Sequence, residues 1–491
     1  MPAKRSLTWA LAILLVVAIP ARAGGFPPIT VVEINPGADN SFAFALEEVP
    51  AVLGGDVYFA ATDATHGMEL WRMNGNTPEI VHEINPSGDA NPLGITKLGD
   101  WLYFRANDEV HGEELWRSNG TNTELVRDIN ASGFEPSIPQ GFTELEGWLY
   151  FAAQENTHGT ELWRTNGGTT EMVSDINAGD GSYPFFFTPL GGWLYFRADD
   201  GVHGFELWRT NGGTTEPVRD INPIGTNSSS INGFTRFGDW LYFAADDGTH
   251  GSELWRTNGT TTELVKDINL VGTDGSVPNF LTPFGDWLYF QATDGLHGFE
   301  LWRTNGTTTE MVRDINPTGV DDSYPNYFVP FGGWLYFGAN DGTHGFELWR
   351  TNGLTTELAH DIAPNATSSN LFGIAAIGDF LYFPLQIDGV GILGRMSRSG
   401  TVETQVLPHS NSFISCMCNS PIHAVGPRLF MLFASDETGW EFAYLDEPTY
   451  GLPETNSETR AVSITLAIAA ALTAAASLAL RRRAAKKLRG K

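Results

Sequence analysis

The sequence of 491 residues predicts an all-β fold, a closed β-propeller made of four-stranded blades. Three observations predict it. A stretch like Ala292–Gly306 occurs in seven copies whose tryptophans are 45 or 47 residues apart, a period typical of propellers. Each copy belongs to a unit of four short segments rich in aromatic and β-branched residues, separated by Gly, Asn or Asp. No segment before the C-terminal tail has helical periodicity.

The unit around Trp302 illustrates the predicted blade. Its strands are expected at Asn279–Phe284, Trp287–Ala292, Glu300–Thr304 and Thr309–Ile315, with tight hairpin turns at Gly-Asp and Asn-Gly. The residues repeated in every such unit are interpreted as structural, because a residue present in each blade usually serves the blade. They are Trp71, Trp116, Trp163, Trp208, Trp255, Trp302, Trp349, His66, His111, His158, His203, His250, His297 and His344.

The phase of the repeat predicts the number of blades. Second strands and fourth strands can each be counted nine times, but the first fourth strand, at Val31–Asn35, has no blade before it. The last unit, which ends near Tyr444, has no fourth strand after it. We therefore expect the N-terminal strand to complete the final blade and close a nine-bladed ring over Ile29–Glu447, with eight blades as the alternative.

Both ends of the chain carry targeting signals. Lys4 and Arg5, an apolar run and an Ala-x-Ala site predict a signal peptide at residues 1–23. After a linker at 448–460, residues 461–480 carry no charge and are long enough for a transmembrane helix. A basic tail at 481–491 places the C-terminus in the cytoplasm. We expect an exported protein held on the outer face of the membrane, at the cell surface, by its C-terminal segment.

The charge of the chain excludes some partners. It has 58 Asp and Glu against 29 Lys and Arg, and eleven of the basic residues lie in the signal peptide or from Arg460 onward. Such an acidic body repels nucleic acid and anionic membranes, so neither is expected as its partner. With two cysteines, Cys416 and Cys418, the fold does not depend on a disulfide framework.

Three motifs resemble known families. The run Glu253–Thr260 resembles the ELWxxDGT repeat of secreted bacterial proteins, with Asn in place of the Asp, and this resemblance implies a surface location. The spacing from Ala292 to Trp302 is similar to the tryptophan-docking motif of quinoprotein propellers, which implies that the tryptophan packs against the neighbouring blade. The C-terminal motif, apolar span and basic end resemble bacterial sorting signals, which implies a sortase-like processing enzyme as a partner. The motif residues are Leu452, Pro453, Glu454 and Thr455, followed by Asn456 where the consensus has Gly.

The loop between the second and third strands is a candidate metal site. Each repeated histidine lies three residues after an acid and three residues before a Glu, and carboxylates are suitable calcium ligands. The candidate ligands are Asp63, Asp108, Asp200, Asp247, Asp294 and Asp341. In the alternative interpretation the histidine fixes the hairpin and the Asp accepts hydrogen bonds from loop amides.

The crossovers between blades differ from one another and are the candidate binding loops. Their aromatic and amide side chains suit an extracellular glycan or protein ligand, although the aromatic ones could equally belong to the core. The candidates are Tyr183, Phe185, Asn232, Asn279, Tyr324 and Tyr327. No hydrolase, phosphate-loop or metalloprotease motif is present, so no catalytic residue is assigned. The sequence therefore predicts a non-catalytic binding, adhesion or envelope scaffold, with a propeller enzyme acting on extracellular glycans through a central channel as the alternative.

Overall fold

The computed structural model describes residues 26–32, 34–35, 50–131, 135–271, 274–319, 321–363, 368–387, 390–407, 422–426, 428–435 and 439–446. The predicted signal peptide, linker, Leu452–Thr455 motif, transmembrane segment and basic tail lie outside these residues. Within them, no helix is long and apolar enough to span a membrane.

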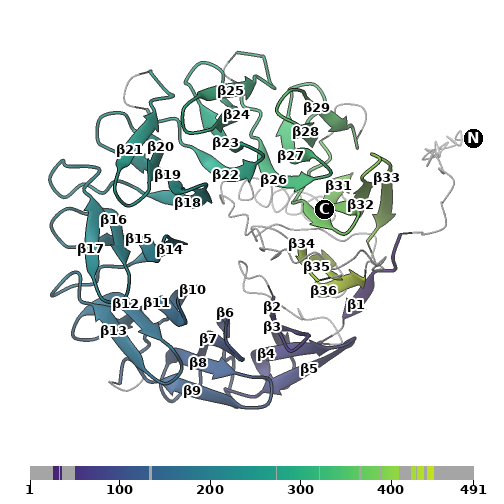
Figure 1. Cartoon of the computed structure of the whole chain (residues 1–491). Coiled ribbons are helices and arrows are strands. Elements are labelled where there is room, and N and C mark those ends of the chain that lie inside the picture. The colour runs from purple at the N-terminus through teal and green to yellow at the C-terminus, as the bar shows by residue number, and fades with distance from the viewer. Residues whose placement is uncertain are drawn as a thin grey trace, which may run out of the picture.

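Nine four-stranded antiparallel sheets follow one another around a ring, which confirms the predicted nine-bladed propeller (Figure 1). The innermost strands of blades 1 to 9 are β2 (Ala51–Leu53), β6 (Leu93–Leu98), β10 (Gln140–Leu145), β14 (Phe185–Leu190), β18 (Asn232–Phe237), β22 (Asn279–Phe284), β26 (Asn326–Phe331), β30 (Ala375–Ile377) and β34 (Ile422–Val425). The second strands are β3 (Asp56–Asp63), β7 (Trp101–Asn107), β11 (Trp148–Glu155), β15 (Trp193–Asp199), β19 (Trp240–Asp246), β23 (Trp287–Thr293), β27 (Trp334–Asn340), β31 (Phe380–Ile387) and β35 (Arg428–Ser435).

The third strands are β4 (Gly67–Asn74), β8 (Glu113–Ser118), β12 (Gly159–Thr165), β16 (Phe205–Thr210), β20 (Ser252–Thr257), β24 (Phe299–Thr304), β28 (Phe346–Thr351), β32 (Val390–Ser397) and β36 (Gly439–Asp446). The outermost strands are β5 (Thr77–His82), β9 (Thr123–Arg127), β13 (Thr170–Ser174), β17 (Thr215–Arg219), β21 (Thr262–Lys266), β25 (Thr309–Arg313), β29 (Thr356–His360), β33 (Val402–Val406) and, in blade 9, β1 (Thr30–Val32).

The hydrophobic core is divided among the spaces between neighbouring blades. Side chains of a strand alternate between its two faces, so Tyr242 faces the following blade and Phe243 faces the preceding one. Trp302 of blade 6 packs on Tyr242, Leu254 and Ile268 of blade 5, and the other repeated tryptophans occupy the same place in their blades. The structural role implied for the tryptophans by the docking-motif resemblance agrees with this packing.

The N-terminal strand closes the ring. β1 pairs antiparallel with β36 from Thr30 opposite Tyr444 to Val32 opposite Phe442. Val32 and Ile34 then share a core with Val57 and Phe59 of blade 1. Arg428 of blade 9 donates hydrogen bonds to the backbone oxygen of Gly75 at 2.8 Å and to Asn76 Oδ1 at 2.9 Å in the last turn of blade 1. First and last blades are thus joined by backbone, apolar and polar contacts.

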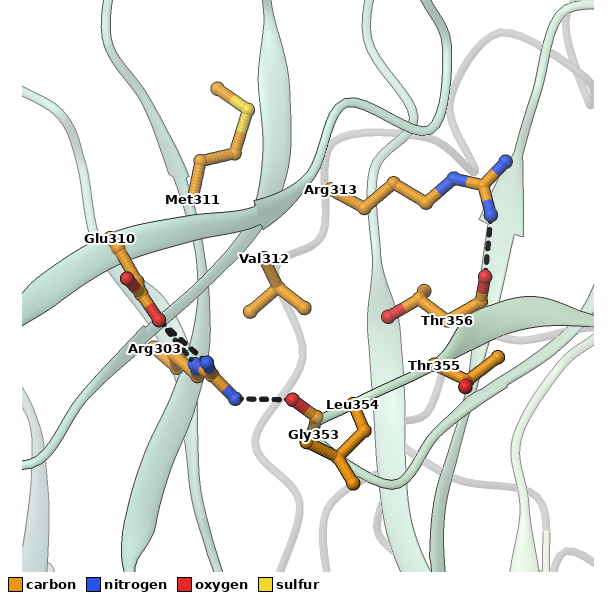
Figure 2. A pocket seen from close by; sticks show the side chains of 9 residues that line it. All are labelled: Arg303, Glu310, Met311, Val312, Arg313, Gly353, Leu354, Thr355 and Thr356. Carbon is orange, nitrogen blue, oxygen red and sulfur yellow. Dashed lines mark hydrogen bonds and ion pairs between the residues drawn. The ribbon is translucent and has the colours of Figure 1, made fainter.

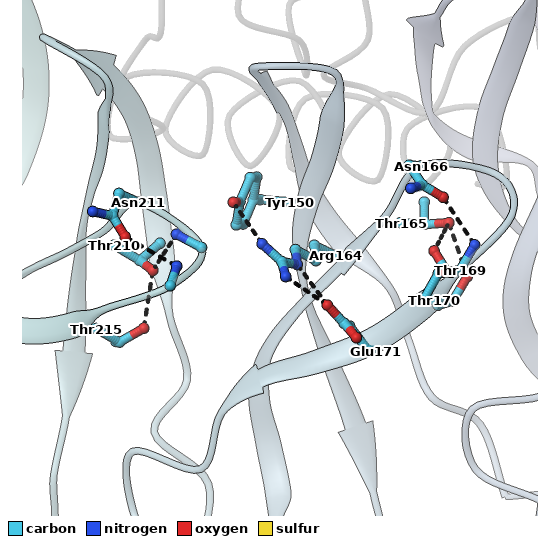
Figure 3. Close-up of polar contacts among 12 residues, drawn as sticks. Tyr150, Arg164, Thr165, Asn166, Thr169, Thr170, Glu171, Thr210, Asn211 and Thr215 are labelled. Atoms are coloured by element: carbon cyan, nitrogen blue, oxygen red, sulfur yellow. Dashed lines mark hydrogen bonds and ion pairs between the residues drawn. The ribbon is translucent and has the colours of Figure 1, made fainter.

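The same set of polar contacts recurs at the outer part of each repeated blade and joins its strands. In blade 3, Arg164 donates to Glu171 of β13 at 2.6 and 2.9 Å and to the Tyr150 hydroxyl at 3.4 Å (Figure 3). Its guanidinium lies over the ring of Trp148 at 4.1 Å. In the adjacent turn, Asn166 Oδ1 accepts from the amides of Gly168 and Thr169. Asn therefore serves this turn where the resembled repeat has Asp, because only its acceptor oxygen is used.

Blade 9 lacks a turn between its third and fourth strands, and Phe26 takes the corresponding place. In blade 6, Arg303 reaches the backbone oxygen of Gly353 in the next blade's turn at 2.8 Å. In blade 8, the equivalent Arg395 is only 2% exposed and lies between the rings of Phe26, at 4.8 Å, and Phe380, at 4.3 Å. The segment before β1 thus replaces a missing piece of blade 9.

Replacing Phe26 with alanine is expected to lower the free energy of unfolding by about 2–3 kcal/mol. The substitution removes the aromatic contact with Arg395 and exposes its buried guanidinium to water. Chemical denaturation of the full chain measures this loss. Phe26→Leu, which keeps most of the apolar area, is the control and should lose about half as much. An unfolding midpoint for Phe26→Ala equal to that of the wild type would contradict this role.

Candidate functional site

The loops between second and third strands hold seven acid–histidine pairs on the face of the ring that also carries the crossovers, here called the crossover face. In blade 6, Asp294 Oδ1 accepts hydrogen bonds from the amides of Leu296 and His297, at 2.9 and 3.0 Å. Asp294 Oδ2 lies 2.8 Å from His297 Nδ1. Five more blades repeat this arrangement at 2.7–2.8 Å, and in blade 3 Glu155 takes the place of the Asp beside His158.

These contacts shift the pKa of both partners. The hydrogen bond to Asp294 raises the pKa of His297 above its usual 6.5. Burial acts to raise the pKa of Asp294, but the hydrogen bonds from Leu296 and His297 outweigh burial and hold it below 3.8. Each partner thus stabilises the ionised form of the other. Because each imidazole is bound through Nδ1, its Nε2 edge is left for other contacts, and the histidine side chains are 32–49% exposed.

The predicted metal ligands remain candidates. Asp63, Asp108, Asp200, Asp247, Asp294 and Asp341 all lie in these loops with both carboxylate oxygens engaged by amides and imidazole. In the part of the chain that the structure describes, no group of three or more His, Cys, Asp or Glu side chains is close enough to hold a metal ion. Calcium binding thus stays a prediction, to be tested by melting with calcium and with EDTA.

The Glu that follows each histidine does not belong to the pair. Glu253 is fully buried, and its carboxylate accepts from the amides of Ile268, Asn269 and Ser276 and from the Ser276 hydroxyl, at 2.5–3.2 Å. Strand alternation turns it away from the loop and into the start of the crossover. Burial raises the pKa of the corresponding Glu69, Glu206 and Glu300 to about 7.

The predicted ligand-binding residues lie at the inner ends of the crossovers. Phe185, Asn232 and Asn279 begin three successive inner strands, β14, β18 and β22. Tyr183 is 51% exposed, and Tyr324 is 49% exposed and stacks on Phe299 at 5.8 Å. Tyr327, by contrast, is only 8% exposed and packs in the core between blades 7 and 8. A bulge in β26 with Tyr327 at a φ of 58° turns this ring inward.

Every repeated crossover contains one residue in the left-handed region just before its inner strand. These residues have φ of 44–50° and include the β-branched Ile138 and Val277, for which this conformation is costly. Tyr183, with φ of 47°, is one of them. The strained backbone at Tyr183 is held in place by the preceding residue, Ser182. The Ser182 amide and hydroxyl both donate hydrogen bonds to the buried Glu161 carboxylate. The crossover therefore holds Tyr183 outward on a rigid support.

Sequence reasoning missed Arg197, which lies beside these residues. It pairs with Phe185 across β14 and β15, and its guanidinium lies 5.0–5.6 Å from the rings of Phe185, Phe186 and Phe205. The same position is alanine in blades 3 and 5 (Ala152 and Ala244) and arginine again in blade 2 (Arg105), so it varies among the blades. The signal in the sequence was the variable x of the Trp-Leu-Tyr-Phe-x-Ala pattern, which is Arg in blades 2 and 4, Ala in blades 3 and 5, Gln in blade 6 and Gly in blade 7.

A groove of about 510 Å³ lies elsewhere, at the outer rim between blades 6 and 7 (Figure 2). Its two arginines already have protein partners. Arg303 contacts Glu310 and the backbone oxygen of Gly353, and Arg313 donates to the backbone oxygen of Thr356 at 2.5 Å. The groove is thus part of the contact between blades, and its cations are not available to a ligand without breaking that contact.

Comparison with known proteins gives only distant structural likenesses. No protein-family model and no curated protein matches the chain. A crystal structure of puromycin hydrolase is similar with a TM-score of 0.37 and 15% identity, covering 72% of this chain and 52% of that one. A structure from a study of two prolyl endopeptidases is similar with a TM-score of 0.41 and 10% identity, covering 79% and 54%. The chain thus spans about half the length of the structures it matches.

Both similar structures are those of enzymes, and this finding contradicts the expectation of a non-catalytic binding, adhesion or envelope scaffold. The expectation that the chain is not an enzyme is corrected with it. Sequence reasoning favoured a scaffold because the titratable residues that it weighed recur in every blade. At TM-scores below 0.5 these likenesses do not carry over any chemistry, which has to come from the residues of this chain.

Proposed function

We propose that this protein is an exported hydrolase that works on the crossover face of its propeller, with the Asp200–His203 pair as general base. One observation carries the proposal, namely the fixed orientation of the His203 imidazole. Asp200 Oδ2 lies 2.8 Å from His203 Nδ1, and Asp200 Oδ1 accepts from the His203 amide at 2.9 Å. The ring is therefore held in one orientation with its Nε2 edge free to face a substrate.

This geometry suits proton transfer to and from a reacting water molecule. An imidazole that is bound by a carboxylate through Nδ1 accepts a proton at Nε2, and the carboxylate stabilises the imidazolium that forms. The hydrogen bond to Asp200 raises the pKa of His203 above 6.5. A pKa close to the working pH is the most effective one for a group that must first accept and then donate a proton.

Blade 4 is favoured over the other six blades for two reasons. The side chain of His203 is 49% exposed, the largest exposed fraction among the seven paired histidines. The β15–β16 hairpin that carries Asp200 and His203 also carries Arg197 with the Phe205 ring against it, and Arg197, unlike Arg105 of blade 2, has no acidic partner among the described residues. A catalytic site must differ from its copies, and blade 4 is where such a difference occurs.

Export and tethering complete the proposal, supported by the sequence at both ends. The signal peptide at 1–23 directs the chain across the membrane, and the segment 461–480 with its basic tail holds it on the outer surface. Recognition of Leu452–Thr455 by a sortase-like enzyme is part of the same proposal. Membrane fractionation of the wild type and of a chain that ends before residue 461 tests the anchor.

The catalytic role is tested by His203→Asn with His250→Asn as the matched control, because both histidines have the same Asp contact in different blades. Hydrolysis of amide, ester and glycosidic chromogenic substrates by the full chain is the measurement. We expect His203→Asn to lower kcat/KM by a factor of about 100 or more. His250→Asn should stay within about threefold of the wild type. Equal effects of both variants, or no hydrolysis of any substrate by the wild type, would refute the proposal.

A further inference from the structure

Arg197 is a desolvated cation that has no acidic partner among the described residues. Its Nη1 lies 3.5 Å from the backbone oxygen of Ile231, a long and weak contact, and its buried Nε has no hydrogen-bond acceptor in the described structure. Three phenylalanine rings surround the guanidinium at 5.0–5.6 Å. Burial lowers the pKa of Arg197, the direction expected when the charged form loses its hydration.

Comparison between blades shows that the fold does not require this arginine. Arg105, at the same position in blade 2, forms an ion pair with Glu113, its Nε lying 3.3 Å from a carboxylate oxygen. Gln291, at that position in blade 6, donates to the backbone oxygen of Pro325 at 3.2 Å. Blades 3 and 5 have alanine there. Among the described residues, only the three phenylalanine rings and the long contact to Ile231 offset the desolvation cost of Arg197, and neither supplies a negative charge.

An anion supplied by a ligand would offset that cost. The planar guanidinium presents parallel N–H donors that match a carboxylate, and such bonds are stronger where water is excluded. Phe185, 38% exposed, leaves aromatic surface open beside the guanidinium. The phenylalanines offer an incoming ligand apolar contact but no hydrogen bonds. The hydroxyl groups of a sugar ring would lose their hydrogen bonds to water there without finding new partners, which is unfavourable. An apolar side chain has no such hydrogen bonds to lose, so its burial there is favourable.

We propose that Arg197 and its phenylalanine cage form a subsite for the terminal carboxylate of a peptide whose last residue is apolar. This inference rests on the proposed hydrolase function, because it names the substrate class of the same face of blade 4. Phe185, Phe186 and Phe205 contact the apolar side chain, and Arg197 fixes the carboxylate, so that peptides are selected by their C-terminal end.

The corresponding reaction is hydrolysis of a peptide bond near that end. The oxygen of a water molecule forms a bond to the carbonyl carbon, and its proton passes to Nε2 of His203. The C–N bond then breaks, and the leaving nitrogen takes the proton from the imidazolium. The second proton of the water passes from the new carboxylic acid to the released amine, so the products are a shortened peptide with a new carboxylate and an ammonium group, and water is the only co-reactant.

Binding measured by calorimetry on the full chain tests the subsite. The probes are N-acetyl-phenylalanine, its C-terminal amide, which lacks the negative charge, and digalacturonic acid, which carries carboxylates on sugar rings. Arg197→Ala is the test variant, because alanine occupies this position in blades 1, 3 and 5, and Arg105→Ala is the matched control. Melting curves confirm that both variants fold.

We expect the wild type and Arg105→Ala to bind N-acetyl-phenylalanine at least tenfold more tightly than its amide, and Arg197→Ala to lose this preference. Equal binding of the acid and the amide by the wild type, or a preference that survives in Arg197→Ala, would overturn the subsite. Stronger Arg197-dependent binding of digalacturonic acid would overturn the peptide class. His203→Asn should bind the probes like the wild type, so failure of the catalytic proposal and failure of the subsite give different results.

Discussion

Replacing Glu253 with alanine is expected to lower the free energy of unfolding by about 3–5 kcal/mol. The carboxylate is fully buried and accepts from three backbone amides at 2.9–3.2 Å and from the Ser276 hydroxyl at 2.5 Å. Without it, the amides of Ile268, Asn269 and Ser276 lose their acceptor at the start of a crossover that is already strained at Val277. The loss should therefore exceed the effect of a simple large-to-small change at a surface site.

Urea unfolding of the full chain measures this effect, with two further variants as controls. Ser276→Ala removes one hydroxyl and leaves the amide contacts, so it should cost only about 1 kcal/mol. Glu253→Gln keeps the shape but has one acceptor oxygen, and it should fall between the other two. If Glu253→Ala unfolded within 1 kcal/mol of the wild type, the buried carboxylate would not be what holds the crossover.

The stability of the propeller is expected to be greatest near pH 5 and to fall as the pH rises to 8. Burial raises the pKa of Glu69, Glu206 and Glu300 from 4.5 to about 7, so the folded protein binds more protons than the unfolded chain between these values. The stabilisation from each group is complete below pH 4.5 and is lost as the pH passes 7. Each of these pKa shifts corresponds to a change in the free energy of unfolding of the order of 3 kcal/mol.

Other groups with shifted pKa values also contribute to the pH dependence of stability. The Asp contact raises the pKa of six loop histidines, so their contribution is present below pH 6.5 and is also lost as the pH rises. The pKa of their Asp partners is lowered, and this part of the stability is lost only below about pH 3.8. Burial lowers the pKa of His360, which acts in the opposite direction but is a single group.

Thermal melting at pH 5, 6, 7 and 8 and constant ionic strength measures the trend. We expect the melting temperature to decrease throughout this range. Glu206→Gln removes one of the titrating groups and should make the decrease shallower. A melting temperature that rises from pH 5 to pH 8 would show that the buried glutamates are ionised in the folded protein at all these values.

Much of the fold could be predicted because the repeat encodes it locally. The strand predicted at Asn279–Phe284 has the same bounds as β22, and its hairpin partners differ by a residue or two. The closure by β1 could also be predicted, because a fourth strand without a preceding blade has no other place to pair. Phe26 could not be assigned, since nothing local shows that it occupies a gap left by an absent turn on blade 9.

The candidate site was harder to predict, because its contacts join residues that are distant in the sequence. The sequence shows a Glu three residues after each histidine but not what it binds, and Glu253 binds Ser276, which is 23 residues later. The sequence left open whether Tyr327 binds a ligand or belongs to the core, because the bulge that turns it inward cannot be seen in the residue pattern. Arg197 was missed because the repeats were compared for the residues that they share. Its distinguishing feature is the lack of an acidic partner among the described residues, which Arg105 has at the same position of blade 2.

The manner of ring closure also determines how the propeller bears mechanical load. The chain leaves the last blade at Asp446, the end of β36, and this strand is bonded to β35 on one side and to β1 on the other. A force applied through the residues that follow Asp446 therefore acts on a strand that is held along both edges. The same force on an outermost strand would peel it away one hydrogen bond at a time. By taking its outermost strand from the N-terminus, blade 9 places Asp446 at the end of a strand that is hydrogen-bonded along both edges.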